Sequence, residues 1–175
     1  MLAIITALFG SAIAAFVGIV LVLIAFFLQG SLRKRGQGGI IASVVSVIGA
    51  LGSLYFVYLN ITRLIEAPGK QTSAAAIITV HIPVTILSIG LLALFVILFL
   101  RKSVNSGAVV KLDLALLAIV ILQFALYAFN LITHWGNYAN GMTEFLYIQI
   151  LLLVIAAVSV LLFALVYKKN KRALA

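Results

Sequence analysis

Five long apolar stretches restrict the fold of this chain more than any other feature of its sequence. They run over residues 2–28, 40–65, 74–100, 112–133 and 145–167. A helix that spans a bilayer needs about 20 apolar residues, whereas a strand of a membrane barrel alternates over about ten. Because 66% of the 175 residues are hydrophobic and only 9% are charged, no water-soluble fold of this size could bury the apolar surface. The sequence predicts a single all-α domain, a polytopic transmembrane helix bundle with five spans.

The basic residues predict how these spans are oriented. With five spans, ten of the twelve Lys and Arg residues fall on one side of the membrane, and only Arg63 and Lys70 fall on the other. The ten are Arg33, Lys34, Arg35, Arg101, Lys102, Lys111, Lys168, Lys169, Lys171 and Arg172. The positive-inside rule places the basic side in the cytoplasm, which predicts an outside N-terminus and a cytoplasmic C-terminus in the cell (plasma) membrane. The first span has no basic leader region and no A-x-A cleavage pattern, so we expect no cleaved signal peptide.

The composition excludes several kinds of site. The chain has no cysteine, which excludes disulfides, thiolate metal sites and cysteine nucleophiles. The net charge of +9 follows from the topology, and no aromatic residues are interleaved with the cations, so we expect no nucleic acid partner. No charged residue falls near the middle of a predicted span, which argues against a proton-coupled pump. We identify no catalytic residue, and the sequence favours a protein that is not an enzyme.

Small residues inside two spans predict close helix packing. They repeat every four residues, as Gly10, Ala14 and Gly18 in the first span and as Ala42, Ser46 and Ala50 in the second. Such stripes let helix backbones approach closely in lipid. The stripes either pack helices of this chain together or dock a partner subunit, and the sequence leaves both interpretations open.

A few polar residues are predicted to lie deep in the membrane. They are Ser46, Ser53, Thr85, Ser88 and Gln123. We expect these side chains to form hydrogen bonds between helices, each contributing roughly 0.6 kcal/mol. The alternative is a path for a polar substrate, and Gln123 is the best candidate for a residue along it.

Both histidines are predicted to lie near the outer surface, where two carboxylates also gather. His81 and His134 are each at least twenty residues, roughly 30 Å of helix, from the cytoplasmic basic residues next to their spans. Glu66 ends the second span on this side, and Glu144 starts the fifth. Beside His81, Pro83 predicts a kink or a late helix start in the third span.

Four interpretations of this outer group are open. All four residues are ordinary interfacial side chains, or they bind Zn, Cu or Fe. The two histidines ligate a b-type haem from both sides, or Trp135, Tyr138 and Tyr147 border a pocket for a quinone or a lipid headgroup. On the cytoplasmic side, Asp113 is predicted to be a charge at the start of the fourth span.

Residues 22–131 resemble a family of small four-helix membrane proteins that are linked to haem-copper oxidase assembly, the CtaM-like proteins. The similar stretch contains a span that ends in the basic-glycine turn LRKRGQGG, a span with LGSLYFVYLN, and then VHIPVTILSIGLLAL. His81 lies in the VHI part of the last segment. The resemblance implies a connection to the respiratory chain.

Three functions are compatible with these observations. The first is a non-catalytic accessory or structural subunit of a prokaryotic membrane complex, linked to respiration. The second is a small oligomeric transporter or channel for a neutral or lipidic solute. The third is an electron-transfer protein that binds haem b through His81 and His134. We expect no cofactor unless the third holds, and the expected partners are the lipid bilayer and other membrane subunits or further copies of this chain.

Overall fold

In the described part of the computed structural model, helices are the only regular secondary structure; this part comprises residues 2–35, 39–66, 69, 77–101, 104, 106–133, 135–136 and 143–174. Side chains are described for these residues except 2–15, 35, 79, 80, 143–145 and 174. Five α-helices are present in this part: α1 (Leu2–Arg35), α2 (Ile40–Glu66), α4 (Ile82–Arg101), α5 (Gly107–Thr133) and α7 (Thr143–Leu174). Each is long and apolar enough to cross a membrane.

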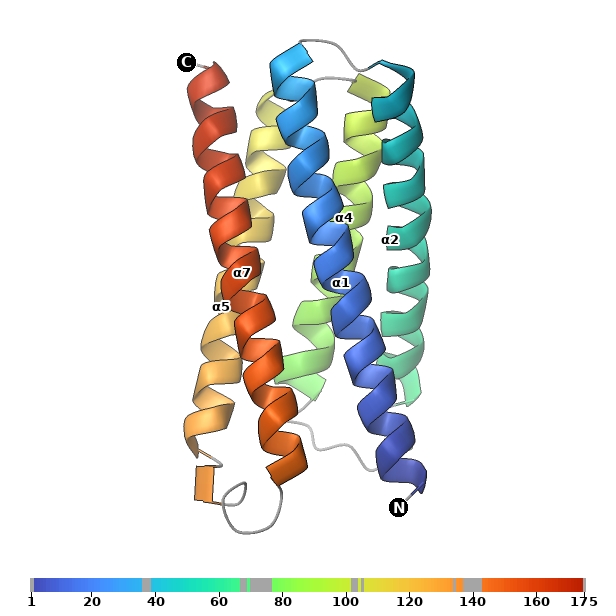
Figure 1. Cartoon of the computed structure of the whole chain (residues 1–175), viewed down its shortest axis with the longest axis vertical. Helices are drawn as coiled ribbons and strands as arrows, with labels where there is room; N and C mark the ends of the chain where they lie inside the picture. The colour runs from blue at the N-terminus through green and yellow to red at the C-terminus, as the bar shows by residue number, and fades with distance from the viewer. Residues whose placement is uncertain are drawn as a thin grey trace.

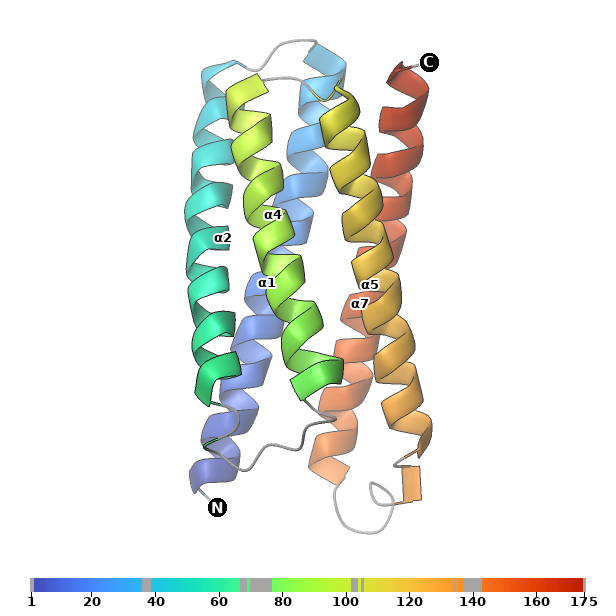
Figure 2. The same cartoon turned by 180° about the vertical axis from the view of Figure 1, so that it is seen from behind.

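The five helices run up and down and form a closed ring in chain order. Each packs against the next, and α7 packs against α1 to complete the ring. Figures 1 and 2 show that α1, α4 and α7 run in one direction and that α2 and α5 return between them. The N-terminus therefore lies at one end of the bundle and the C-terminus at the other. Short connections make sequential helices antiparallel neighbours, which accounts for this order.

Most cations whose place is described lie at the C-terminal end of the bundle. This end, called the basic end below, carries Lys34, Arg101, Lys111, Lys168 and Lys169 among others. Helix α1 extends seven residues beyond its predicted limit, and α7 extends from 167 to Leu174. The extensions are rich in Lys and Arg, which are good helix formers, so the helices continue where the apolar stretches stop.

The third span begins later than its apolar stretch. One π-helical turn, η2 (Ile77–His81), precedes α4, whose first residue is Ile82. Pro83 therefore occupies the first turn of α4, where a missing N–H costs no intrahelical hydrogen bond. The Thr85 hydroxyl donates to the carbonyl of His81 at 2.7 Å and ties the two segments together. Of the two predicted effects of Pro83, a kink or a late helix start, the structure shows the late start of the α-helix. Residues 74–76 of the predicted span lie outside the described part.

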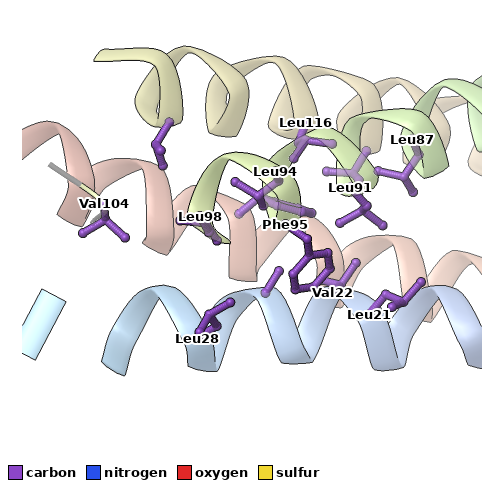
Figure 3. Close-up of a cluster of buried hydrophobic side chains, with 14 of the residues drawn as sticks. Leu21, Val22, Leu28, Leu87, Leu91, Leu94, Phe95, Leu98, Val104 and Leu116 are labelled. Carbon is purple, nitrogen blue, oxygen red and sulfur yellow. The ribbon is translucent and has the colours of Figure 1, made fainter. Parts of the chain in front are cut away.

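Helix α4 supplies the centre of the hydrophobic core. Its side chains Leu91, Leu94, Phe95 and Leu98 are at most 1% exposed, and Figure 3 shows them among the residues of α1 and α5. Phe95 lies directly against Gly49 of α2, where an added Cβ would lie 2.3 Å from the ring. Long apolar side chains cover much of the outer surface, which is the pattern expected of helices that face lipid.

Candidate ligand site

A pocket of about 130 Å³ lies inside the bundle, in the half away from the basic end. All five α-helices and η2 contribute to its lining. Its walls are mainly apolar and include Val22, Leu87 and Ile155. Its polar residues are Asn60, Arg63, His81, Gln123, Tyr127 and Ser159. We call this the central pocket, and polar side chains of several helices meet in it.

Helix α2 brings Asn60 and Arg63 to the pocket on its last two turns. Residues 46, 49, 53, 56 and 60 of α2 form its buried face, which follows the three- and four-residue spacing of a helix. The Asn60 amide donates to the carbonyl of Phe56 at 2.8 Å, which fixes its side chain and leaves its oxygen available. Arg63 lies one turn beyond Asn60, three residues before the end of the helix at Glu66.

Helices α5 and α7 line the deeper part of the pocket. Gln123 and Tyr127 are one turn apart on α5, and both are buried. Gln123 lies ten residues before the end of α5, which corresponds to roughly 15 Å, about half the thickness of a bilayer core. On α7, the Ser159 hydroxyl donates to the carbonyl of Ile155 at 2.9 Å. The pocket therefore extends from the helix ends near Arg63 and His81 towards the middle of the bundle.

The described side chains that line the pocket are either positively charged or neutral. Partial burial lowers the pKa of His81, and the positive charge of Arg63 lowers it further. The imidazole is therefore neutral at pH 7, with one nitrogen that donates and one that accepts. No carboxylate is present among the described residues that line the pocket.

Two of the four residues of the predicted metal or haem site, His81 and Glu66, have described side chains. His81 is half-buried in the central pocket, whereas Glu66 is exposed at the end of α2. His134 lies outside the described residues, and the Glu144 side chain does as well. No group of three His, Cys, Asp or Glu residues suited to a metal ion occurs in the part that the structure describes. The Arg63 charge beside His81 also disfavours a metal cation at that imidazole.

The prediction for Asp113 is wrong. It is not a charge at the start of a helix, because α5 begins six residues earlier and the Asp113 side chain is fully buried. Its Oδ1 accepts a hydrogen bond from Gln29 of α1 at 3.0 Å, and its Oδ2 accepts one from Asn170 of α7 at 2.8 Å. Asn170 in turn accepts hydrogen bonds from the Arg33 guanidinium, through Nε at 3.2 Å and through Nη2. This polar cluster joins three helices at the basic end.

Most of the other deep polar residues lack the hydrogen bonds between helices that the sequence predicted. Ser46, Thr85 and Ser88 donate at 2.7 Å to carbonyls of preceding residues along the chain. Such bonds satisfy a hydroxyl within one turn, so no partner helix is needed. The Ser53 hydroxyl is buried without a hydrogen-bond partner among the described residues. Gln123 is the predicted residue of this set that lines the central pocket.

The small-residue stripes lie at contacts within the chain where they are described. A Cβ on Gly18 of α1 would lie 3.2 Å from the ring of Phe56 in α2. Ala42 and Ala50 pack against the hydrophobic core, and Ser46 is buried. The side chains around Gly10 and Ala14 are not among those described.

Sequence reasoning missed several residues of the two polar regions. Asn60, Tyr127 and Ser159 line the central pocket, and Gln29 and Asn170 hold Asp113. A signal for Tyr127 was present, because it lies four residues after Gln123 and thus on the same helix face. Gln29 and Asn170 carry no such signal, since each is far from Asp113 in the sequence.

Comparisons with protein-family models, with curated proteins and with solved structures find no match for this chain.

Proposed function

We propose that this chain is a small multi-pass membrane transporter or carrier that binds a lipidic solute in the central pocket. The observation that carries the proposal is the pocket itself, in which polar side chains from several helices meet between apolar walls. Ligand sites are typically concave and mostly apolar, with a few polar groups that orient the ligand. The polar residues would hold the headgroup, and the apolar walls would contact the start of the chain.

The size and depth of the pocket also support a lipidic ligand. Its volume of about 130 Å³ is below the roughly 300–1,000 Å³ of pockets that enclose drug-sized molecules. It suits a small headgroup whose tail leaves between the helices into lipid. The positive-inside rule places the basic end in the cytoplasm, so the pocket belongs to the outer half of the plasma membrane in this proposal.

Photolabelling tests this function. The probe is a long-chain alcohol with a diazirine near its hydroxyl, applied to the purified chain in lipid nanodiscs, and the labelled peptides are mapped by mass spectrometry. Ala156 lines the pocket and is buried, so Ala156→Phe should fill the cavity and abolish labelling of pocket residues. Ala125 is exposed on α5, and Ala125→Phe should leave that labelling unchanged. Labelling confined to outward-facing residues, or insensitive to Ala156→Phe, would contradict the proposal.

A second candidate is a non-catalytic accessory subunit of a prokaryotic respiratory complex. Its support is the resemblance of residues 22–131 to the oxidase-assembly family, together with an apolar groove of about 400 Å³ between α1 and α2. Ile24, Phe27 and Val45 are among the residues that line this groove. Purification from native membranes in mild detergent separates the two candidates. Constant stoichiometry with other respiratory subunits would favour the second, and isolation of the chain alone would favour the first.

A further inference from the structure

Two polar side chains in the central pocket lack partners although they are almost fully buried. Gln123 is 5% exposed and Tyr127 is 6% exposed, and both line the cavity from the same face of α5. Neither side chain forms a hydrogen bond with another described residue, and neither has a polar atom among the fully enclosed atoms without a partner, so these polar atoms are reached from the cavity. More than 90% of buried polar groups in proteins have a partner, and an unpaired one costs about 1–3 kcal/mol. The donors of this pair are therefore open to a partner within the cavity.

The other polar groups of the pocket restrict what this partner can be. Gln123 and Tyr127 carry N–H and O–H donors, and no described residue of the lining carries a negative charge. A ligand with an ammonium group would find no carboxylate and would lie near a cation. A ligand whose headgroup accepts hydrogen bonds matches the donors that are present.

The depth of the pair argues for a neutral acceptor. Gln123 lies roughly 15 Å from the end of α5, well below Arg63 near the end of α2. Placing a charged headgroup at that depth is costly, whereas a carbonyl group loses much less hydration energy. A carbonyl oxygen has two lone pairs and can accept from the Gln123 amide and the Tyr127 hydroxyl.

We propose that Gln123 and Tyr127 form a hydrogen-bond donor pair that selects a lipid with a neutral carbonyl headgroup, the chemistry of a quinone. The pair binds one carbonyl in the deep part of the pocket, and Val22, Leu87 and Ile155 contact the ring or the adjoining chain. The proposal rests on the proposed function, because it names the class of lipid that the same site takes.

Competition against the photolabelling probe tests this inference. The competitors are decylubiquinone, which carries two ring carbonyls, and decanoic acid, which carries an anionic headgroup. Decylubiquinone should displace the probe from the pocket at a concentration at least tenfold lower than decanoic acid. Gln123→Leu and Tyr127→Phe should each raise the concentration of decylubiquinone needed by about three- to tenfold, the loss of one hydrogen bond. Neither substitution should change competition by decanoic acid.

Ser88→Ala provides a matched control. It removes a fully buried hydroxyl that donates within its own helix and does not line the pocket, so competition by decylubiquinone should be unchanged. Thermal unfolding of each variant shows whether the fold is retained. Tyr127→Phe changes only one oxygen atom, which keeps the test informative if Gln123→Leu does not fold.

The contrary outcomes are distinct from one another. Equal competition in wild type, Gln123→Leu and Tyr127→Phe would mean that water satisfies the pair, and it would overturn the inference. Stronger competition by decanoic acid, lost in Arg63→Gln, would assign an anionic lipid and would overturn it as well, while the proposed function would stand. Absence of any probe in the pocket would overturn both proposals.

Discussion

The amide of Gln29 donates a hydrogen bond of 3.0 Å to the carboxylate of Asp113, 84 positions further along the chain. Both side chains are fully buried, and Asn170 completes the group from α7. The carboxylate thus accepts from two amides and shares the cluster with the Arg33 guanidinium, which binds Asn170. A buried charge is tolerated when it is paired and hydrogen-bonded, so the cluster joins α1, α5 and α7 at the basic end.

Asp113→Ala should destabilise the protein strongly. The substitution leaves the buried Gln29 amide without its acceptor and removes one of the two acceptors of the Asn170 amide, which should cost about 2–5 kcal/mol in the free energy of unfolding. Unfolding by SDS in mixed micelles measures this loss. Lys111→Ala, at an exposed position of the same helix, should change stability by less than about 0.5 kcal/mol. Equal stability of the two variants would show that the cluster contributes nothing to folding.

Gly49→Ala should also be destabilising, because the new Cβ would lie 2.3 Å from Cε1 of Phe95. Overpacking of a core contact of this kind costs about 1–3 kcal/mol. The double variant with Phe95→Leu should regain part of that loss, since the smaller side chain can move away. Gly30→Ala is the matched control: no atom lies within 4 Å of its Cβ position, and it should stabilise α1 by about 0.5–1 kcal/mol. Similar effects of Gly30→Ala and Gly49→Ala would contradict the packing argument.

The purified chain should show no haem absorbance. A b-type haem between His81 and His134 needs a site of at least drug size, whereas the central pocket that His81 lines holds about 130 Å³. The neighbouring Arg63 also opposes binding of a ferric ion at His81. Spectra of the oxidised and dithionite-reduced protein, with metal analysis of the same sample, provide the measurement. A reduced α-band that disappears in His81→Ala would instead make the chain an electron-transfer protein.

Residues at the helix ends of this chain can test its orientation, because the natural sequence contains no cysteine. Arg172→Cys lies at the basic end, and Glu66→Cys lies at the opposite end. A membrane-impermeant maleimide added to intact cells should modify Glu66→Cys and leave Arg172→Cys unmodified until the cells are opened. Both side chains are exposed, so their reactivity depends on the side of the membrane. The reverse pattern would place the basic end outside and contradict the positive-inside assignment.

The length of the apolar stretches was enough to predict five helices that are long and apolar enough to cross a membrane. The limits of α1 and α7 were less accurate, because Lys and Arg continue a helix after lipid contact ends. The sequence also singled out His81 and Gln123, which line the central pocket, since polar residues are rare inside such spans. The partners of Asp113 could not be predicted, because they are brought together only when α1, α5 and α7 pack. The spacing of residues along one helix indicates which side chains share a face of that helix. It does not indicate which other helix packs against that face.

His81 should make stability depend on pH below neutrality. Its pKa in the folded protein is lowered below the ordinary value of about 6.5, first by burial and then by the charge of Arg63. Between these two pKa values the unfolded chain binds a proton that the folded chain does not, so the free energy of unfolding should fall as the pH drops below about 6.5. Above that pH both states are neutral, and the contribution of His81 should be constant. Unfolding in detergent across this range should show the slope in wild type and a reduced slope in His81→Gln. A slope that is unchanged in His81→Gln, or stability that rises towards low pH, would show that another group controls the dependence.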